Sequence, residues 1–152
     1  MHPALRHLLG LQTAPTSRSE ALLRAYIIDD EYGSLRAWRH DAEAQECDLV
    51  VACLRAAWPW PTNRHFRELR ITFGDIRDLK VVVPPAMDTR DDGELIWLPD
   101  CSLQRFDVGR TGDGQERCAL EADGFMFDVS FGAMVWREVT TAFERTHEGK
   151  LR

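Results

Sequence analysis

Long apolar runs are missing from this chain of 152 residues. No stretch approaches the ~20 apolar residues that a membrane-spanning helix needs. The apolar patch Leu8-Leu9 is also shorter than the core of a signal peptide, because Gly10 follows it at once. We therefore expect a cytoplasmic protein with no membrane partner.

Lysine is almost absent, since the chain has only Lys80 and Lys150, and the formal net charge is −6. Nucleic-acid binding needs a concentration of Lys and Arg that displaces counterions from the phosphates. The composition therefore argues against a nucleic-acid partner. An acidic surface fits either plain solubility or attraction to a basic partner.

Paired cysteines at the spacing of zinc ligands are also missing. The chain has neither a Gly-x-Ser-x-Gly motif nor a cysteine beside a histidine in the sequence, so it offers no recognisable nucleophile. We expect no metal, no cofactor and no enzymatic activity. Four reduced thiols are expected to pack as small apolar groups, at Cys47, Cys53, Cys101 and Cys118.

The rest of the chain is organised around residues 65–83. Residues 68–73 alternate polar and apolar side chains, which is the period of a strand with one buried face. Gly74-Asp75 interrupts this alternation, and a run rich in β-branched valine resumes it at residues 79–83. The pattern predicts two adjacent strands joined by a short turn.

The N-terminal residues 1–30 are expected to be helical. Residues 3–12 place leucines on one helical face, and residues 20–29 carry a second apolar stripe behind a capping serine. Three carboxylates follow at the expected end of the second helix, where the helix dipole disfavours negative charge. They form either a solvated turn or a negative patch for a partner, and they are Asp29, Asp30 and Glu31.

Residues 35–58 fit neither period cleanly. A helix would align their apolar residues only loosely, whereas strands at residues 37–46 and 48–56 place them at a period of two. We favour two strands, because the second segment is rich in residues that prefer a sheet. The loop after them holds Trp58 and Trp60, which either cover the core or form a binding hot spot.

The remaining chain reads as further sheet joined by tight turns. Residues 109–114 are rich in glycine and form a hairpin tip rather than a phosphate-binding loop, because a strand and not a helix follows them. Residues 123–124 mark the next turn. Residues 133–139 form one more strand or begin a terminal helix, and the tail 146–152 is expected to fray. Strands are predicted at residues 94–98, 101–108, 115–122 and 125–131.

Together these elements predict a single domain over residues 1–152 with an α+β fold. Its β-rich core, residues 37–139, is expected to be a mainly antiparallel sheet of about seven to nine strands, curved or folded into two layers. Two N-terminal helices are expected to lie against one face or edge of this sheet.

The nearest approach to a catalytic or ligand-binding site is His40 with Glu43, together with His65 further along the chain. A histidine and a carboxylate can bind a ligand or transfer protons. However, His40 and its neighbour Asp41 would point to opposite faces of a strand, so they cannot both line one pocket. The competing interpretation is that His40 donates a structural hydrogen bond at the edge of the strand. These residues define one alternative, a small enzyme or ligand-binding domain.

Two motifs lie along the predicted sheet. The first is Trp38-Arg39-His40-Asp41-Ala42-Glu43, and the second, after a strand pair, is Leu69-Arg70-Ile71-Thr72-Phe73 with Asp75-Ile76-Arg77-Asp78-Leu79 behind it. Through these motifs, residues 35–139 resemble a broad group of small β-rich bacterial proteins, several of them predicted immunity proteins of polymorphic toxin systems. The resemblance implies a cytoplasmic, non-enzymatic protein that blocks a cognate toxin by covering its active site.

A toxin partner would contact exposed acidic and aromatic residues, because acidic clusters complement a basic surface. A further alternative is a structural subunit that forms a homodimer through an uncovered sheet edge. The residues expected to contact the toxin are Asp29, Asp30, Glu31, Trp58, Trp60, Asp88, Asp91 and Asp92.

Overall fold

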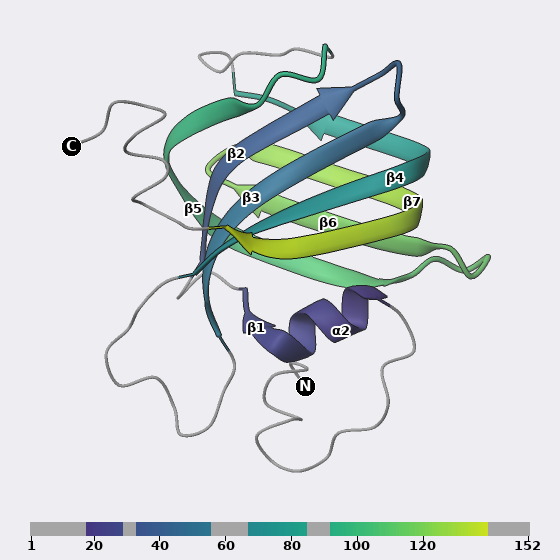
Figure 1. The fold of residues 1–152 in the computed structure, drawn as a ribbon, viewed down its shortest axis with the longest axis horizontal. Helices are drawn as coiled ribbons and strands as arrows, with labels where there is room; N and C mark the ends of the chain where they lie inside the picture. Colours follow the sequence, from purple (N-terminus) through teal and green to yellow (C-terminus); the bar gives the residue numbers. More distant parts are fainter. Residues whose placement is uncertain (1–17, 29–32, 56–66, 85–91, 140–152) are drawn as a thin grey trace.

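A computed structural model describes residues 18–28, 33–55, 67–84 and 92–139 of the chain. Strands make up most of these residues, and all of the strand pairs are antiparallel (Figure 1). Among the described residues, no helix has the length and apolarity needed to cross a membrane. The elements are α2 (Arg18–Ala25), β1 (Tyr26–Ile27), β2 (Ser34–Asp41), β3 (Glu46–Arg55), β4 (Arg67–Val82), β5 (Ile96–Arg110), β6 (Glu116–Ala122) and β7 (Phe125–Val139).

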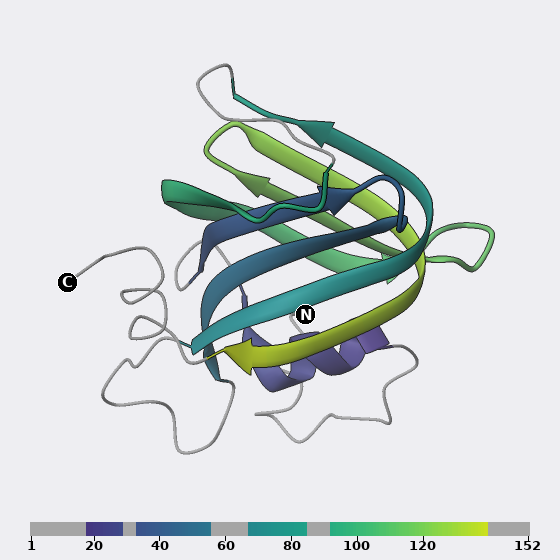
Figure 2. The same cartoon turned by 45° about the horizontal axis from the view of Figure 1, so that its top comes forward.

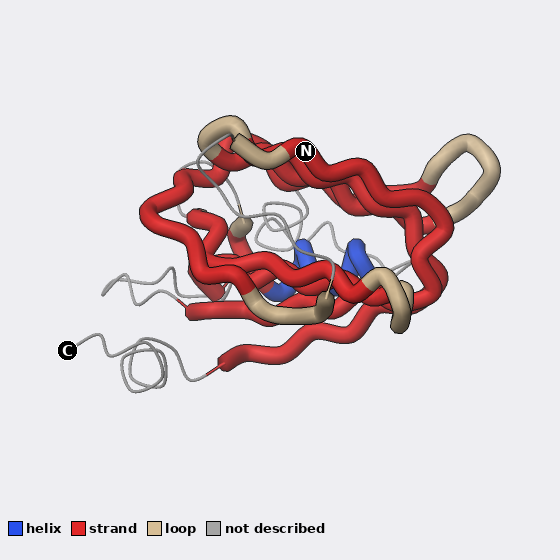
Figure 3. The backbone as a smooth tube through the Cα atoms, turned by 90° about the horizontal axis from the view of Figure 1, so that it is seen from above, coloured by secondary structure: helices blue, strands red, loops and turns tan. Residues whose placement is uncertain are grey.

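The sheet closes on itself. Its strand order is β1-β3-β2-β5-β6-β7-β4, and β4 also pairs with β3, so the backbone runs round a ring when seen from above (Figure 3). The ring is flattened into two layers (Figures 1 and 2). The front layer contains β2, β3 and the parts of β4, β5 and β7 beside them, and the back layer contains β6 with the other halves of β4, β5 and β7.

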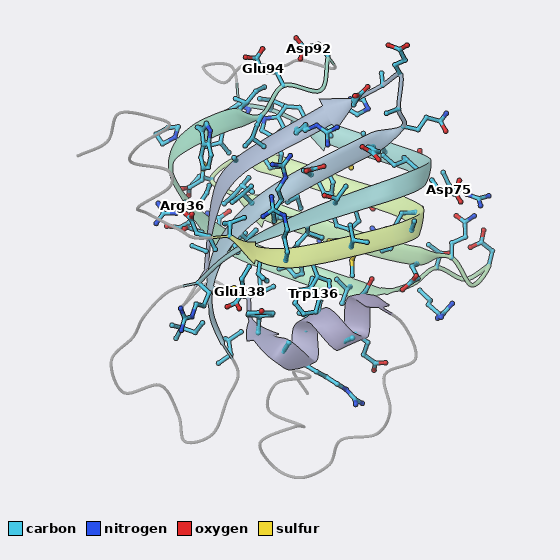
Figure 4. All side chains as sticks on the ribbon, viewed as in Figure 1. Arg36, Asp75, Asp92, Glu94, Trp136 and Glu138 are labelled. Atoms are coloured by element: carbon cyan, nitrogen blue, oxygen red, sulfur yellow. The ribbon has the colours of Figure 1, made fainter. Side chains whose placement is uncertain are left out.

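β4 passes from one layer to the other as one strand of 16 residues, so the predicted turn at Gly74-Asp75 is wrong. Both halves of β4 pair with β7 rather than with each other. Asp75 has a φ of 50°, and the register shifts between Ile76 and Asp78. The break in alternation therefore marks a bend with an irregular register, which lies where the label of Asp75 stands in Figure 4.

Most of the other predicted strands are confirmed, with some of them joined. The described part of the ambiguous segment, residues 35–55, contains the two strands β2 and β3 rather than a helix. The two predicted strands after residue 93 are the single strand β5, and residues 133–139 continue β7. The turn at residues 123–124 has φ values of 45° and 87°, as a tight hairpin turn requires.

The expected α+β class is wrong, because the described residues contain a single short helix beside a mostly antiparallel sheet. The predicted helix over residues 20–29 ends at Ala25, since Tyr26 and Ile27 pair with the end of β3. The other predicted helix, at residues 3–12, lies outside the described residues. The sheet itself, curved into two layers, is as predicted.

The core fills the space between the layers. Phe73 of the front layer lies 4.9 Å from Phe131, and Trp38 lies 5.5 Å from Phe125, measured between ring centroids. At one end of the ring, Tyr26 packs edge-on against Trp136 at 5.4 Å, close to α2 (Figure 4). All four cysteines are free and buried, as predicted.

Candidate functional site

Most of the residues expected to contact a partner lie outside the described residues. These are Asp29, Asp30, Glu31, Trp58, Trp60, Asp88 and Asp91. Asp92 is described and exposed, forms an isolated bridge with Asp41, and accepts a hydrogen bond from the Glu94 backbone at 3.0 Å. Figure 4 shows Asp92 and Glu94 at the end of the molecule opposite α2.

The expected pocket of His40, Glu43 and His65 stays a prediction, because the described residues include only two of its members. His65 lies outside them, and Glu43 lies in an exposed turn after the end of β2. The backbone carbonyl of His40, and not its imidazole, accepts a hydrogen bond from Gly93 at 2.9 Å. No group of three or more metal-ligating side chains occurs in the described part of the chain.

Asp48 is the centre of a polar cluster that the sequence did not predict. Its side chain is only 1% exposed. Oδ1 accepts a hydrogen bond from Arg39 Nη1 at 2.6 Å, and Oδ2 accepts one from Arg70 Nε at 2.5 Å. The Thr72 hydroxyl lies 3.2 Å from the same Oδ2. Both oxygens of this buried carboxylate are therefore satisfied, as a buried charge requires.

Strand register brings this cluster together. Arg39 of β2 and Thr72 of β4 are both paired with Asp48 of β3, so the three side chains lie side by side across the front layer. The inward-facing neighbours Cys47 and Leu49 belong to the core. Because successive strand residues alternate between the two faces, Asp48 lies on the outer face of the sheet.

Arg39 also ties β2 to the segment before β5. Its Nε donates to the Gly93 carbonyl at 2.8 Å, and its Nη2 lies 3.3 Å from Glu46 Oε1. Burial lowers the pKa of Arg39, but the charges and hydrogen bonds of Asp48 and Glu46 outweigh that effect and leave the pKa above its usual value. Each of the three guanidinium nitrogens of Arg39 thus has a partner within the fold.

Beside this cluster, the front layer has a hollow of about 340 Å³, which we call the front-layer pocket. Two of its arginines, Arg70 of β4 and Arg137 of β7, are directly paired across the strands. Val135, paired with Thr72, forms an apolar part of its lining and is 62% exposed. The pocket is lined by Arg39, Glu46, Asp48, Arg70, Thr72, Val135, Trp136 and Arg137.

The outer face of the back layer has a different character. Val82 of β4 and Met126 of β7 are paired, and they are 57% and 47% exposed. We call this pair, with the buried Ala119 beside it, the back-layer surface. Two hollows of about 190 and 180 Å³ share Ala119, Arg105 and Arg117 and extend from this surface across the back layer.

Ion pairs surround the back-layer surface. Arg117 Nε and Nη2 donate to the two oxygens of Asp128 at 2.8 and 2.5 Å. These hydrogen bonds hold the pKa of Asp128 below its usual value. Arg105 pairs with Asp107 at 2.5 Å and lies 3.6 Å from Glu121. An exposed apolar centre with a charged rim is the anatomy of a protein interface.

One signal in the sequence points to the front-layer cluster. Asp48 is a lone carboxylate at the start of an apolar run from Leu49 to Leu54, where an unpaired charge would be costly. Its partners follow only from the register of β2, β3 and β4, which a single sequence does not supply.

No protein-family model, curated protein or solved structure matches the chain.

Proposed function

We propose that this chain is a non-enzymatic binding protein of the immunity type, which neutralises a cognate bacterial toxin by direct contact. The observation that carries the proposal is the paired exposure of Val82 and Met126 on the back layer. Large apolar side chains that lie together at the surface mark contact sites more often than scattered ones do. The resemblance of residues 35–139 to a broad group of small β-rich bacterial proteins, several of them predicted immunity proteins, favours the same function.

A basic protein is the partner that the charge favours. The chain has a net charge of −6, and β4 leads from Val82 into the segment that contains Asp88 and Asp91. Opposite charge speeds association and selects among partners, while desolvated apolar side chains supply more of the affinity. The ion pairs around Val82 and Met126 then form the polar rim of the contact.

The test begins with capture of the partner. The tagged full-length chain is co-expressed with the products of its neighbouring genes, captured, washed at ~0.5 M salt to screen surface charge, and analysed by mass spectrometry. We expect one stoichiometric protein whose toxicity the chain suppresses. A chain that elutes alone, or only as a homodimer, contradicts the proposal.

Two matched substitutions then locate the contact. Val82→Ser removes an exposed valine from the back layer, and Val135→Ser removes one from the front layer. With the captured partner, we expect Val82→Ser to raise Kd about tenfold, as loss of a hot-spot side chain does. Val135→Ser should change Kd less than about twofold. An equal or larger effect of Val135→Ser would move the contact to the front layer.

A further inference from the structure

We propose that the front-layer pocket is a binding site for an oxyanion, with a phosphate or carboxylate group held between Arg70 and Arg137. The site lies on the layer opposite the back-layer surface, and it does not depend on the proposed toxin contact.

Two cationic side chains stand opposite each other in this pocket. Arg70 and Arg137 are partners in the β4–β7 register and both line the hollow. Like charges directly opposite each other on a sheet are destabilising. A bound anion between them converts this repulsion into two favourable charge-assisted contacts.

The residues that the structure describes do not use up the donors of these two arginines. Among the described residues, Arg70 has hydrogen bonds and ion pairs only through its Nε, which binds Asp48 at 2.5 Å. Its two Nη groups therefore have no partner among the described residues and can donate to a ligand. No hydrogen bond or ion pair to Arg137 occurs within the described part of the chain, and this side chain is exposed.

Asp48 orients Arg70 rather than neutralising the whole pocket. The Nε contact fixes the direction of the Arg70 guanidinium, and the same carboxylate is shared with Arg39. The pocket has three arginines against the carboxylates Glu46 and Asp48, which leaves one positive charge in excess. This local excess stands out in a chain with a net charge of −6.

The shape and chemistry of the pocket define the ligand class. Guanidinium groups present planar forks of donors that match phosphate and carboxylate oxygens better than an ammonium does. The volume of about 340 Å³ suits a small organic molecule rather than a bare ion alone. Val135 adds an apolar wall for the body of such a molecule. The site therefore takes a small organic phosphate or carboxylate.

The test uses the full chain, with inorganic phosphate, a simple sugar phosphate and citrate as probes. Binding is measured by isothermal titration calorimetry. The ionic strength is held constant, because salt screens exposed charges and would itself change the affinity. A titration with sodium chloride is the blank. We expect saturable binding of at least one probe with one site per chain. Comparison of the phosphate and citrate titrations shows whether the site binds phosphate groups, carboxylate groups or both.

Arg137→Gln is the decisive variant, because Arg137 has no described contact whose loss would disturb the fold. We expect it to raise Kd about tenfold, the scale of one charge-assisted contact. Arg77→Gln is the matched control: it removes the same charge from an exposed arginine paired with Asp75, outside the pocket. The control should leave Kd within about twofold of the parent value.

Arg137→Lys distinguishes hydrogen bonding by the planar guanidinium group from attraction by the positive charge alone. Lysine keeps the charge but lacks the planar set of donors. We expect it to restore less than half of the lost binding free energy. The proposal is overturned if no probe binds above the chloride blank, or if Arg137→Gln and Arg77→Gln change Kd equally.

Discussion

Asp48 shows how one residue links three strands. Its carboxylate on β3 binds Arg39 of β2 and Arg70 of β4, and it is almost fully buried. A buried ion pair adds little net stability compared with apolar packing, because taking its charges out of water is costly. Removing one member of the pair is much more damaging, since the remaining charges lose their partner.

We expect Asp48→Ala to lower the free energy of unfolding by about 3–5 kcal/mol, the range for a broken buried ion pair. Asp107→Ala is the control, because Asp107 is an exposed partner of Arg105. Exposed pairs contribute about 0.2–1 kcal/mol. Urea denaturation of both variants measures the difference, and similar losses would contradict the role assigned to Asp48.

The cysteines give a second test at the residue scale. Burial, with a smaller contribution from the charge of Asp48, raises the pKa of the Cys47 thiol to about 12. Burial likewise raises the pKa of Cys53 and Cys118. Because the thiolate is the reactive form, these thiols are expected to be inert in the folded chain until the pH approaches the raised values.

We therefore expect no rapid reaction of the folded chain with a disulfide reagent such as DTNB at about pH 8, where the free-thiol pKa of ~8.5 would already give reactive thiolate. In guanidinium chloride all four cysteines should react. Absorbance of the released thiolate counts them. A thiol that reacts within seconds in the native chain would show an accessible cysteine.

At the scale of elements, Asp75 of β4 and Gly132 of β7 lie close together at the bend. A Cβ at Gly132 would collide with the Asp75 carboxylate, and its distance to Asp75 Cγ would be 2.9 Å. Asp75 itself has a φ of 50°, a conformation that favours glycine. The two positions are therefore coupled across the bend.

We expect Gly132→Ala to destabilise the fold by about 1–3 kcal/mol, as overpacking does. Asp75→Gly should recover much of this loss, because it removes the carboxylate and suits the positive φ. Gly109→Ala is the control, since nothing lies within 4 Å of its added Cβ. Thermal unfolding of the two single variants and the double variant provides the test, and simple additivity would contradict the coupling.

The same elements show what the sequence could and could not predict. The alternation in residues 68–73 and 125–131 predicted strands, because a one-sided sheet produces a period of two. Alternation could not predict that β4 continues past Gly74, because a bend and a turn interrupt the pattern in the same way. The end of α2 was also misplaced, because Tyr26 and Ile27 suit a helix face as well as a strand.

At the scale of the whole molecule, closure of the sheet makes β3 its most enclosed strand. Its residues from Cys47 to Leu54 are all buried, and its main part pairs with β2 on one side and β4 on the other. Residues 76–82 of β4 instead pair with β7 alone among the described strands. The two segments therefore differ in how many of their amides are protected.

Hydrogen exchange followed by NMR should show this difference. We expect every amide from Asp48 to Ala52 to exchange slowly, since the strands on both sides accept their hydrogen bonds. In residues 76–82, slow and fast amides should alternate, because only those directed at β7 have an acceptor. Uniform protection along residues 76–82 would reveal a further neighbour on the open side of β4.

The hairpin between β5 and β6 is a site where a label can be attached without covering either outer face of the sheet. Its tip is held by its own hydrogen bonds, such as Gly114 to the Thr111 carbonyl at 2.9 Å, and it projects away from the ring in Figures 1 and 3. A Cβ at Gly112 would meet nothing within 4 Å. A Gly112→Cys variant would carry a dye or an immobilising tether away from both outer faces, so a single sensor chip could be exposed to a toxin and to a small anion in turn.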